Sequence, residues 1–580
     1  MTRKKSAVPP APVPALDAGR FLHDIQAQMA RSLLAEPEKI VALADDIAST
    51  ANGGEPDEEL CDLLTMALDE ARMAQEGGQR AGKRCLDALS RHLADMSRKG
   101  EITIRGNMAI TRCYVRANLA VPDIAPGAQS VRQEASFLAG DEGRGDEGRD
   151  PVAVFVDSLG DLVKNVDDDP SMLHHVFAET LPGIPPDARR MVCRIAAANP
   201  DPHFEPLGCA WLLDSSEPVR AGAAEGLGDR IAAGHLSASA LGRLAMLRTW
   251  IVDEPHRRCV DGLIRQAIRS GVPSEPADVP RYRITGCVSS PVDGAGAQSL
   301  GIGLQRGRSR SIAVVLLKQG FGVKDAYAAP CDSVAEQRGI LQQMAGPGEE
   351  GRVSLDYVRT ALRVALADGI RNGVYPAPGL IDVVDVCALS DLRPADDSSP
   401  AGLLGQYDAE ERLRSLSADA RDKLVAASGE WAAIYPVLGS WFEDSDDMFD
   451  AIGAGASAAA RKKALWTWLE TRRAFWSSIV MRTALLLQDR GDPMADSFAV
   501  TACEISGDRP LRRIPVMSAI ADQTLEARSA AGAPAGDGMP LDFDEALMDF
   551  LMNAVAAAPA ATRGPSRGRK TRSPAPRKRK

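Results

Sequence analysis

Aromatic residues are scarce in this chain of 580 residues. Trp, Tyr and Phe together make up 4% of it, although 45% of the residues are hydrophobic. Strands favour aromatic and β-branched side chains, whereas Ala and Leu, which dominate here, favour helices. The composition therefore predicts a mainly α-helical protein, and its length is sufficient for several domains, each with a core.

The chain also lacks paired cysteines. None of its ten cysteines forms a C-x-x-C pair, and several, such as Cys61, Cys193 and Cys209, lie on apolar stretches with helical spacing. A disulfide framework or a zinc site needs cysteines at characteristic spacings. We therefore expect reduced, buried thiols, which indicate a cytoplasmic protein.

Long hydrophobic runs are missing. No uncharged apolar run approaches the ~20 residues that span a bilayer. The chain begins MTRKKSAVPPAPVPAL, in which prolines interrupt the continuous apolar core that a signal peptide needs. We expect a soluble, intracellular protein that makes no membrane contact.

Catalytic and cofactor signatures are missing as well. The sequence has no G-x-S-x-G, no H-E-x-x-H and no Walker-type loop. The glycines of 294–307 lack the order of a phosphate loop, and hairpin turns explain them better. Two polar clusters, D-x-H-x-E at 201–205 and the aspartates at 444–450, are explained more simply by loop capping and by a helix N-terminus. We predict no cofactor and no metal site, and the pattern leaves enzymatic activity open.

The most informative stretch that is present runs from Ala196 to Ile231 and predicts two helices joined by a tight turn. Asp214, Ser215 and Ser216 can accept hydrogen bonds at the start of the second helix, and Pro218 fits its first turn. The apolar stripes of the two helices comprise Leu207, Ala210, Leu212 and Leu213, then Val219, Ala223, Leu227 and Ile231. This spacing resembles a HEAT repeat, and the resemblance implies hairpins stacked into a curved array.

Composition shifts divide the rest of the chain. The fold class that we predict is mainly α, with a HEAT-like helical array, a small antiparallel β meander and additional helical domains. The predicted parts are a disordered N-terminus (1–15), a helical unit (16–119), a linker (120–150), the HEAT-like array (151–280, with hairpins over 151–271), a three-stranded antiparallel meander (281–330), a helical domain (331–529), and an end segment (530–580).

Local patterns support these divisions. The linker contains GDEGR twice in tandem, which has nothing apolar to bury. In RYRITGCVSS, apolar and basic residues alternate, as is typical of a strand. A long helix is expected from Ala458 to Gln488, and five of the seven tryptophans lie between Trp431 and Trp476, so we expect an aromatic-rich core in this domain.

Basic residues are concentrated at the C-terminus. The net charge is −11, yet the last twenty residues contain nine bases and no acid. Together with the arginines of one predicted turn, they are candidate phosphate contacts: Arg306, Arg308, Arg310, Arg569, Lys570, Arg572, Arg577, Lys578, Arg579 and Lys580. Such contacts bind nucleic acid without reading its sequence. The alternatives are a solvated tail or one that folds onto the protein's own acidic surface, and the tail has no aromatics for base stacking.

A short amphipathic helix is predicted at 541–555, between two flexible segments. Its apolar face needs a groove, either on this protein or on a partner. The candidate docking residues are Leu541, Phe543, Leu547, Met548, Phe550 and Leu551.

Three functional hypotheses follow. The first is a non-enzymatic protein-binding or scaffold protein of a bacterial cytoplasm, because stacked hairpins create a long concave surface and no converging polar groups are visible. The second is a nucleic-acid-associated protein that contacts phosphates through its basic tail. The third is an enzyme whose site lies between domains. A pocket with clustered ionisable groups near the meander and the helical domain at 331–529 would support this hypothesis.

Overall fold

The computed structural model describes residues 29–532 with short gaps. The gaps are residues 51–53, 55, 123, 131–158, 161, 165–169, 182–183, 185, 275–281, 346–350, 409 and 454–456. The predictions for the N-terminus (1–15), the docking helix (541–555) and the basic tail lie outside the described residues.

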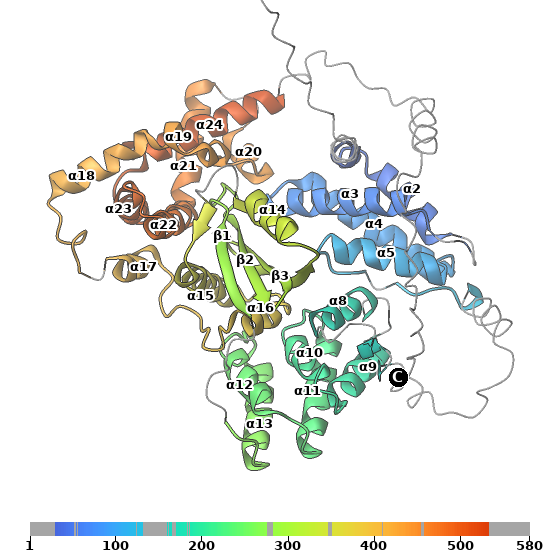
Figure 1. The fold of residues 1–580 in the computed structure, drawn as a ribbon. Coiled ribbons are helices and arrows are strands. Elements are labelled where there is room, and N and C mark those ends of the chain that lie inside the picture. Colours follow the sequence, from blue (N-terminus) through green and yellow to red (C-terminus); the bar gives the residue numbers. More distant parts are fainter. Residues whose placement is uncertain are drawn as a thin grey trace, which may run out of the picture. The chain divides into compact units, whose positions relative to one another are not determined.

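The fold is mainly α-helical with one small antiparallel sheet, as the composition predicted (Figure 1). Residues up to Arg528 form one unit, to which the following description applies. Among the helices that the structure describes, none has the length and apolar character needed to cross a bilayer.

The N-terminal helices enclose a core of their own, built around Leu64, Leu89 and Ile110. Asp57 caps the start of one helix by accepting hydrogen bonds from two backbone N–H groups, and Gly100, with a φ of 74°, ends the next. These helices are α2 (Pro37–Ala48), α3 (Glu58–Glu76), α4 (Arg80–Lys99) and α5 (Ile104–Arg116).

The next six helices lie in two layers, and α10–α11 and α12–α13 form hairpins between them. One layer contains α8, α10 and α12, and the other contains α9, α11 and α13. Their bounds are α8 (Pro170–Thr180), α9 (Pro186–Ala198), α10 (Phe204–Trp211), α11 (Glu217–Ala232), α12 (Ala238–Leu247) and α13 (Glu254–Arg269). We call these six helices the array. Gly222 and Gly226 allow α11 to approach α9 closely, because a Cβ on either would lie 2.3 Å from a backbone carbonyl oxygen of α9.

The hairpin predicted from 196–231 is confirmed as α10 and α11. Val219 and Leu227 are buried, and Pro218 lies in the first turn of α11. The capping differs in detail. Asp214 Oδ1 accepts from the backbone N–H of Ser216 at 2.7 Å, whereas Ser216 itself makes no side-chain cap.

The sheet has five strands in the order β4-β3-β2-β1-β5, and all neighbours are antiparallel. The strands are β1 (Arg283–Ser289), β2 (Ala297–Arg306), β3 (Ser309–Lys318), β4 (Gly322–Cys331) and β5 (Arg352–Val353). The prediction of three strands was therefore wrong. In β4 a bulge beside Lys324 breaks the alternation that marks a strand, and β5 has only two residues, too few to show a pattern.

Helices cover both faces of the sheet. On one face, α14 (Val334–Ala345) packs over Gly301 and Gly303, where a Cβ would lie about 3 Å from the side chain of Leu341. The alternate residues Leu300 and Ile302 face the other side and share a core with α15 (Leu355–Arg371) and α16 (Leu380–Cys387).

That same core includes the array. The α8–α10–α12 layer contacts α16 and β4, and the buried residues of the array and of the sheet form one cluster. Two polar contacts fix the junction. The indole N–H of Trp250 donates to the carbonyl oxygen of Leu392 at 3.1 Å, and Arg243 pairs with Asp385 at 2.8 Å.

The C-terminal helices surround an aromatic-rich core, as expected. The rings of Trp431 and Phe498 stack with their centroids 3.5 Å apart, and Trp441 and Trp476 are also fully buried. The elements are α17 (Pro400–Tyr407), α18 (Ala418–Ala426), η3 (Ala427–Gly429), α19 (Trp431–Ile434), η4 (Pro436–Ser440), α20 (Asp446–Ile452), α21 (Ala458–Thr471), α22 (Arg473–Asp489), α23 (Ala495–Ser506), η5 (Leu511–Arg513) and α24 (Pro515–Gly532).

The single helix expected over 458–488 is two helices. The chain breaks between α21 and α22 at Arg472, whose φ is −101°. Its side chain pairs with the buried Glu443 at 2.9 Å, which holds the junction in place.

Candidate functional site

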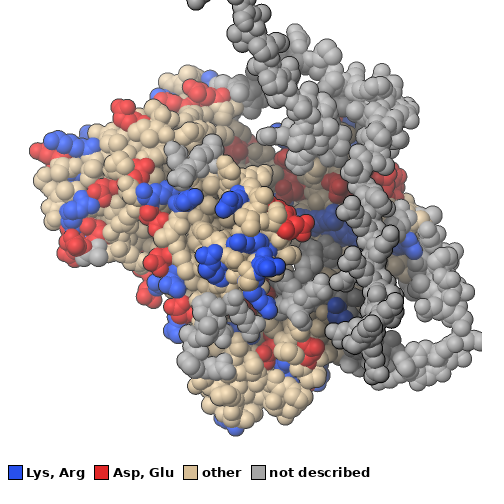
Figure 2. Space-filling view, viewed as in Figure 1, with Lys and Arg blue, Asp and Glu red and all other residues tan. Residues whose placement is uncertain are grey.

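Basic side chains gather at one end of the sheet (Figure 2). There β1 begins and β2 turns into β3 through Gly307, whose φ of 61° suits a tight hairpin turn. The register aligns Gln305 of β2 with a basic residue on each neighbouring strand. We call the following set the arginine surface: Arg283, Arg306, Arg308 and Arg310.

These four guanidinium groups have no carboxylate partner within 4 Å among the described residues. Arg283 and Arg310 both donate to Oε1 of Gln305, at 2.5 and 2.9 Å, so two cations share one neutral acceptor. Arg306 and Arg308 are exposed. A cluster of arginines with neutral partners keeps its positive charge available for an anion.

The structure thus brings together the three loop arginines that the sequence suggested. Arg306 and Arg308 lie at the hairpin turn, and Arg310 lies half-buried on β3. Arg283 was missed as a candidate, although the alternation in RYRIT had marked it as an outward strand residue. The seven tail residues and the six docking-helix residues lie outside the described residues.

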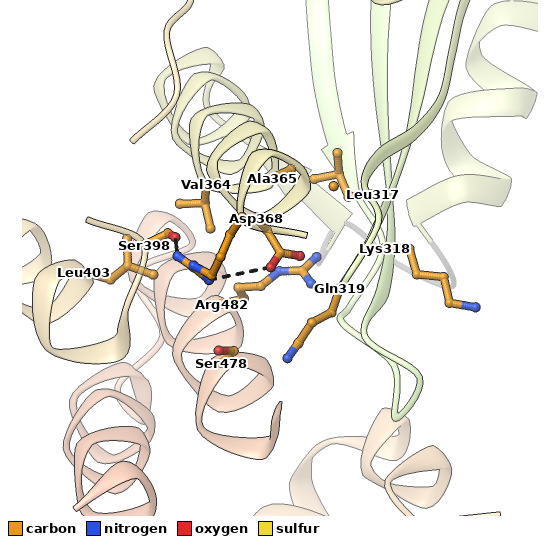
Figure 3. A pocket seen from close by; sticks show the side chains of 12 residues that line it. Leu317, Lys318, Gln319, Val364, Ala365, Asp368, Ser398, Leu403, Ser478 and Arg482 are labelled. Atoms are coloured by element: carbon orange, nitrogen blue, oxygen red, sulfur yellow. Dashed lines mark hydrogen bonds and ion pairs between the residues drawn. The ribbon is translucent and has the colours of Figure 1, made fainter. Parts of the chain in front are cut away.

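A second feature is a small pocket between β3, α15 and α22, which is partly open to solvent and has a cavity volume of about 30 Å³ (Figure 3). Charged and polar side chains from four segments converge on it. Its polar lining consists of Lys318, Gln319, Asp368, Arg371, Ser398, Ser478 and Arg482.

Arg482 is the deepest charge in this pocket. Its guanidinium donates to the carbonyl oxygen of Gly296 at 2.9 Å and to Oε1 of Gln298 at 3.2 Å. No carboxylate lies within 4 Å of it in the part of the chain that the structure describes. Protein surrounds the group and burial lowers the pKa of Arg482, yet its side chain keeps some exposed area because the pocket reaches it.

The other charges of the pocket are already paired. Asp368 accepts from the backbone N–H of Gly320 at 2.6 Å and lies 3.7 Å from Arg371. Lys318 pairs with Glu76 at 2.6 Å. Arg482 is therefore the cation of this lining that has only neutral partners.

Neutral polar groups support Arg482 from the side of the sheet. Gln298 donates to Ser289 at 2.9 Å and to the hydroxyl of Tyr357 at 2.6 Å. Burial raises the pKa of Tyr357, so this hydroxyl stays protonated and supplies no counter-charge. The lining contains neither histidine nor cysteine, so its chemistry suits binding of an anion better than acid–base catalysis.

The two polar clusters weighed in the sequence make internal contacts. Glu205 accepts from Ser237 at 2.7 Å and pairs with the buried Arg230 at 3.4 Å. In the acidic cluster, Asp447 pairs with Arg80 at 3.1 Å. Asp446 lies in the first turn of α20, as the helix N-terminus interpretation expected.

Three family models match separate parts of the chain. "Uncharacterised protein y4lR N-terminal domain" matches residues 3–122, "Y4lR second domain" matches 185–271, and "Y4lR C-terminal helical domain" matches 401–529. The second match covers α9 to α13, and the sheet lies between the second and third matches.

A relative over most of the length is "Uncharacterized protein y4lR" of Sinorhizobium fredii (strain NBRC 101917 / NGR234). The two are 27% identical over 478 residues, which is 81% of this chain and 88% of that protein. No solved structure matches the chain. The similarity to this relative therefore extends over most of the chain, and the printed name states no activity.

Proposed function

We propose that this chain is a non-enzymatic binding protein whose arginine surface binds a phosphate-bearing polyanion, with nucleic acid as the leading candidate. One observation carries the proposal: four guanidinium groups lie at one end of a sheet with only neutral partners among the described residues. The chain as a whole is acidic, with a net charge of −11, so this local positive charge is not a consequence of overall composition.

Arginine suits this role because its planar guanidinium matches the geometry of phosphate oxygens. Contacts of this kind follow the nucleic-acid backbone and do not read sequence. The basic tail (561–580) would add further phosphate contacts to those of the arginine surface. Binding should therefore be insensitive to sequence and steeply weakened by salt.

The test is fluorescence anisotropy with a duplex DNA and a single-stranded RNA of mixed sequence, from about 50 to about 200 mM salt. The double variant Arg306→Gln/Arg308→Gln should bind more weakly, and its salt slope should fall by about 0.9 for each phosphate that these two arginines neutralise on duplex DNA. The matched control is Arg258→Gln/Arg265→Gln, two exposed arginines of α13. A chain truncated after residue 560 separates the contribution of the tail. Unchanged affinity in the surface variant would reject the proposal, and a loss confined to the truncated chain would assign the binding to the tail instead.

A second candidate, binding of a protein partner, rests on a different observation. The α8–α10–α12 layer of the array packs on the sheet, whereas the main contacts of the α9–α11–α13 layer lie within the array. This layer exposes Met191 by 57% and Ile268 by 60%. The resemblance to HEAT repeats, whose stacked hairpins form extended binding surfaces, supports this candidate.

Deleting the array would not test this second candidate, because the array shares its core with the sheet. The double variant Met191→Asp/Ile268→Asp changes only exposed side chains. A partner captured by the wild-type chain should be lost in this variant and retained by the control Met108→Asp, which alters a methionine of α5 that is 53% exposed. Equal capture by all three chains would exclude the α9–α11–α13 layer as the binding surface.

A further inference from the structure

We infer that the pocket between β3, α15 and α22 binds a small ligand through its phosphate or carboxylate group, with Arg482 as the main charge partner. This site is separate from the arginine surface and does not rest on the proposed function. It also lies near the sheet and the C-terminal helices, where a pocket with clustered ionisable groups would favour the enzyme hypothesis, but its lining has neither histidine nor cysteine and suits anion binding better.

Arg482 carries a charge that protein surrounds. A cation that is surrounded by protein loses its hydration, and this loss is expensive unless an anion or several hydrogen bonds replace the water. Gly296 and Gln298 provide two neutral acceptors, but the described residues provide no carboxylate within 4 Å. An oxyanion in the pocket would supply the missing charge.

No carboxylate of the described residues pairs directly with Arg482. Asp368 is the carboxylate of the lining, and it is engaged by Gly320, Asn372 and Arg371. Asp293 accepts from the backbone N–H of Ala297 at 2.7 Å. Burial lowers the pKa of Arg482, and both acids oppose this shift by their charge, but neither lies within 4 Å of its guanidinium.

The pocket combines polar groups that face one space with apolar walls. Figure 3 shows Arg482 and Ser478, both from α22, facing the same space as Asp368. The Ser478 hydroxyl has no hydrogen-bond partner in the described structure, so it is available to an oxyanion. Leu317, Val364 and Leu403 form apolar walls, which limit the ligand to a small body behind its charged group.

The experiment measures thermal unfolding of the full chain against increasing inorganic phosphate or acetate, with chloride added to hold ionic strength constant. A ligand that binds only the folded state raises Tm in a saturable way. We expect a saturable rise with one of the two anions. Phosphate identifies a phosphoryl ligand, and acetate identifies a carboxylate ligand. A rise no greater than that in chloride alone, with both anions, would overturn the inference.

Variants connect the effect to the pocket. Arg482→Gln should abolish the anion-dependent rise in Tm, and Arg482→Lys should retain part of it because the charge is kept. Ser478→Leu fills the pocket without changing Arg482, so it tests the site even where Arg482→Gln does not fold. Arg258→Gln, at an exposed position of α13 outside both proposed sites, is the control and should behave as the wild type. An undiminished rise in Ser478→Leu or in folded Arg482→Gln would overturn the inference.

Discussion

A Cβ on Gly226 would lie 2.3 Å from the carbonyl oxygen of Arg194, so α11 can approach α9 this closely only without a side chain at that position. Replacing Gly226 by Ala should force the two helices apart and lower the free energy of unfolding by about 1–3 kcal/mol. Urea denaturation of the full chain measures this loss.

Gly262 of α13 provides the matched control. Nothing lies within 4 Å of the position that its Cβ would take. Gly262→Ala should therefore be neutral or raise the free energy of unfolding by about 0.5–1 kcal/mol, because Ala is the better helix former. A similar loss in both variants would show that helix propensity, and not the close approach, governs Gly226.

Glu76 is the centre of a partly buried ion cluster. It accepts from Lys318 at 2.6 Å, from Arg72 at 3.0 Å and from Lys324. Glu76→Gln should lower the free energy of unfolding by about 1–3 kcal/mol, because it removes the anion that several partly buried cations share. Glu59→Gln, at an exposed position of the same helix, should change it by less than about 0.5 kcal/mol.

The same cluster predicts that the free energy of unfolding depends on pH in the acid range. Burial alone would raise the pKa of Glu76, but the hydrogen bonds from Lys318 and Lys324 outweigh it and lower the pKa to about 2. The stabilisation is thus complete above the ordinary pKa of about 4.3 and is lost as pH falls towards 2. Unfolding free energies from pH 6 down to the acid transition should fall less steeply in Glu76→Gln than in the wild type.

The stabilisation that His174 contributes should depend on pH in the opposite direction. Burial lowers the pKa of His174, but the hydrogen bond with Asp382 at 3.1 Å and the charges of Asp214 and Asp325 raise the pKa overall. Its stabilisation is therefore complete below about pH 6.5 and is lost as pH rises through the raised value. The loss should disappear in His174→Gln.

Comparing the wild type with His174→Gln and with a control variant separates the contribution of His174 from those of other histidines. Burial lowers the pKa of His256, which contributes a change of opposite sign below about pH 6.5 in both chains. His235→Gln, at an exposed position, should keep the wild-type profile. A wild-type profile in His174→Gln would refute the role of the pair with Asp382.

Thiol labelling should be selective. All ten cysteines are free, and Cys259 on α13 is the exposed one. Burial raises the pKa of Cys193, Cys209 and Cys387 to about 12, so these thiols resist alkylation in the folded chain. Mass spectrometry after iodoacetamide treatment of the native protein should locate the first adduct at Cys259, and Cys259→Ser should remove this adduct.

Much of the helical architecture was predictable because its signals are local. Leu207 on α10 and Val219 and Leu227 on α11 belong to two stripes with helical spacing, and all three residues are buried in the array. The arginine surface was partly predictable for the same reason, since Arg306 and Arg308 lie two residues apart in one turn.

The pocket was not predictable, because its residues are distant in sequence. Lys318, Asp368 and Arg482 come from three separate elements and meet only in the folded chain. Arg482 lies within the apolar run of α22, where a lone basic residue gives no sign of what faces it. The bulge beside Lys324 was hidden too, since an extra residue in one strand is visible only in the register of its neighbour.

The contacts of Trp250 with Leu392 and of Arg243 with Asp385 have a consequence for cooperativity. In a free-standing solenoid each hairpin contacts only its neighbours, so the hairpins can unfold stepwise. A destabilised terminal hairpin then unfolds locally while the others stay folded. Here the α8–α10–α12 layer packs against the sheet and the helices that follow it in the chain, and it shares a core with them. Heat or denaturant should therefore melt the hairpins and the sheet in one transition.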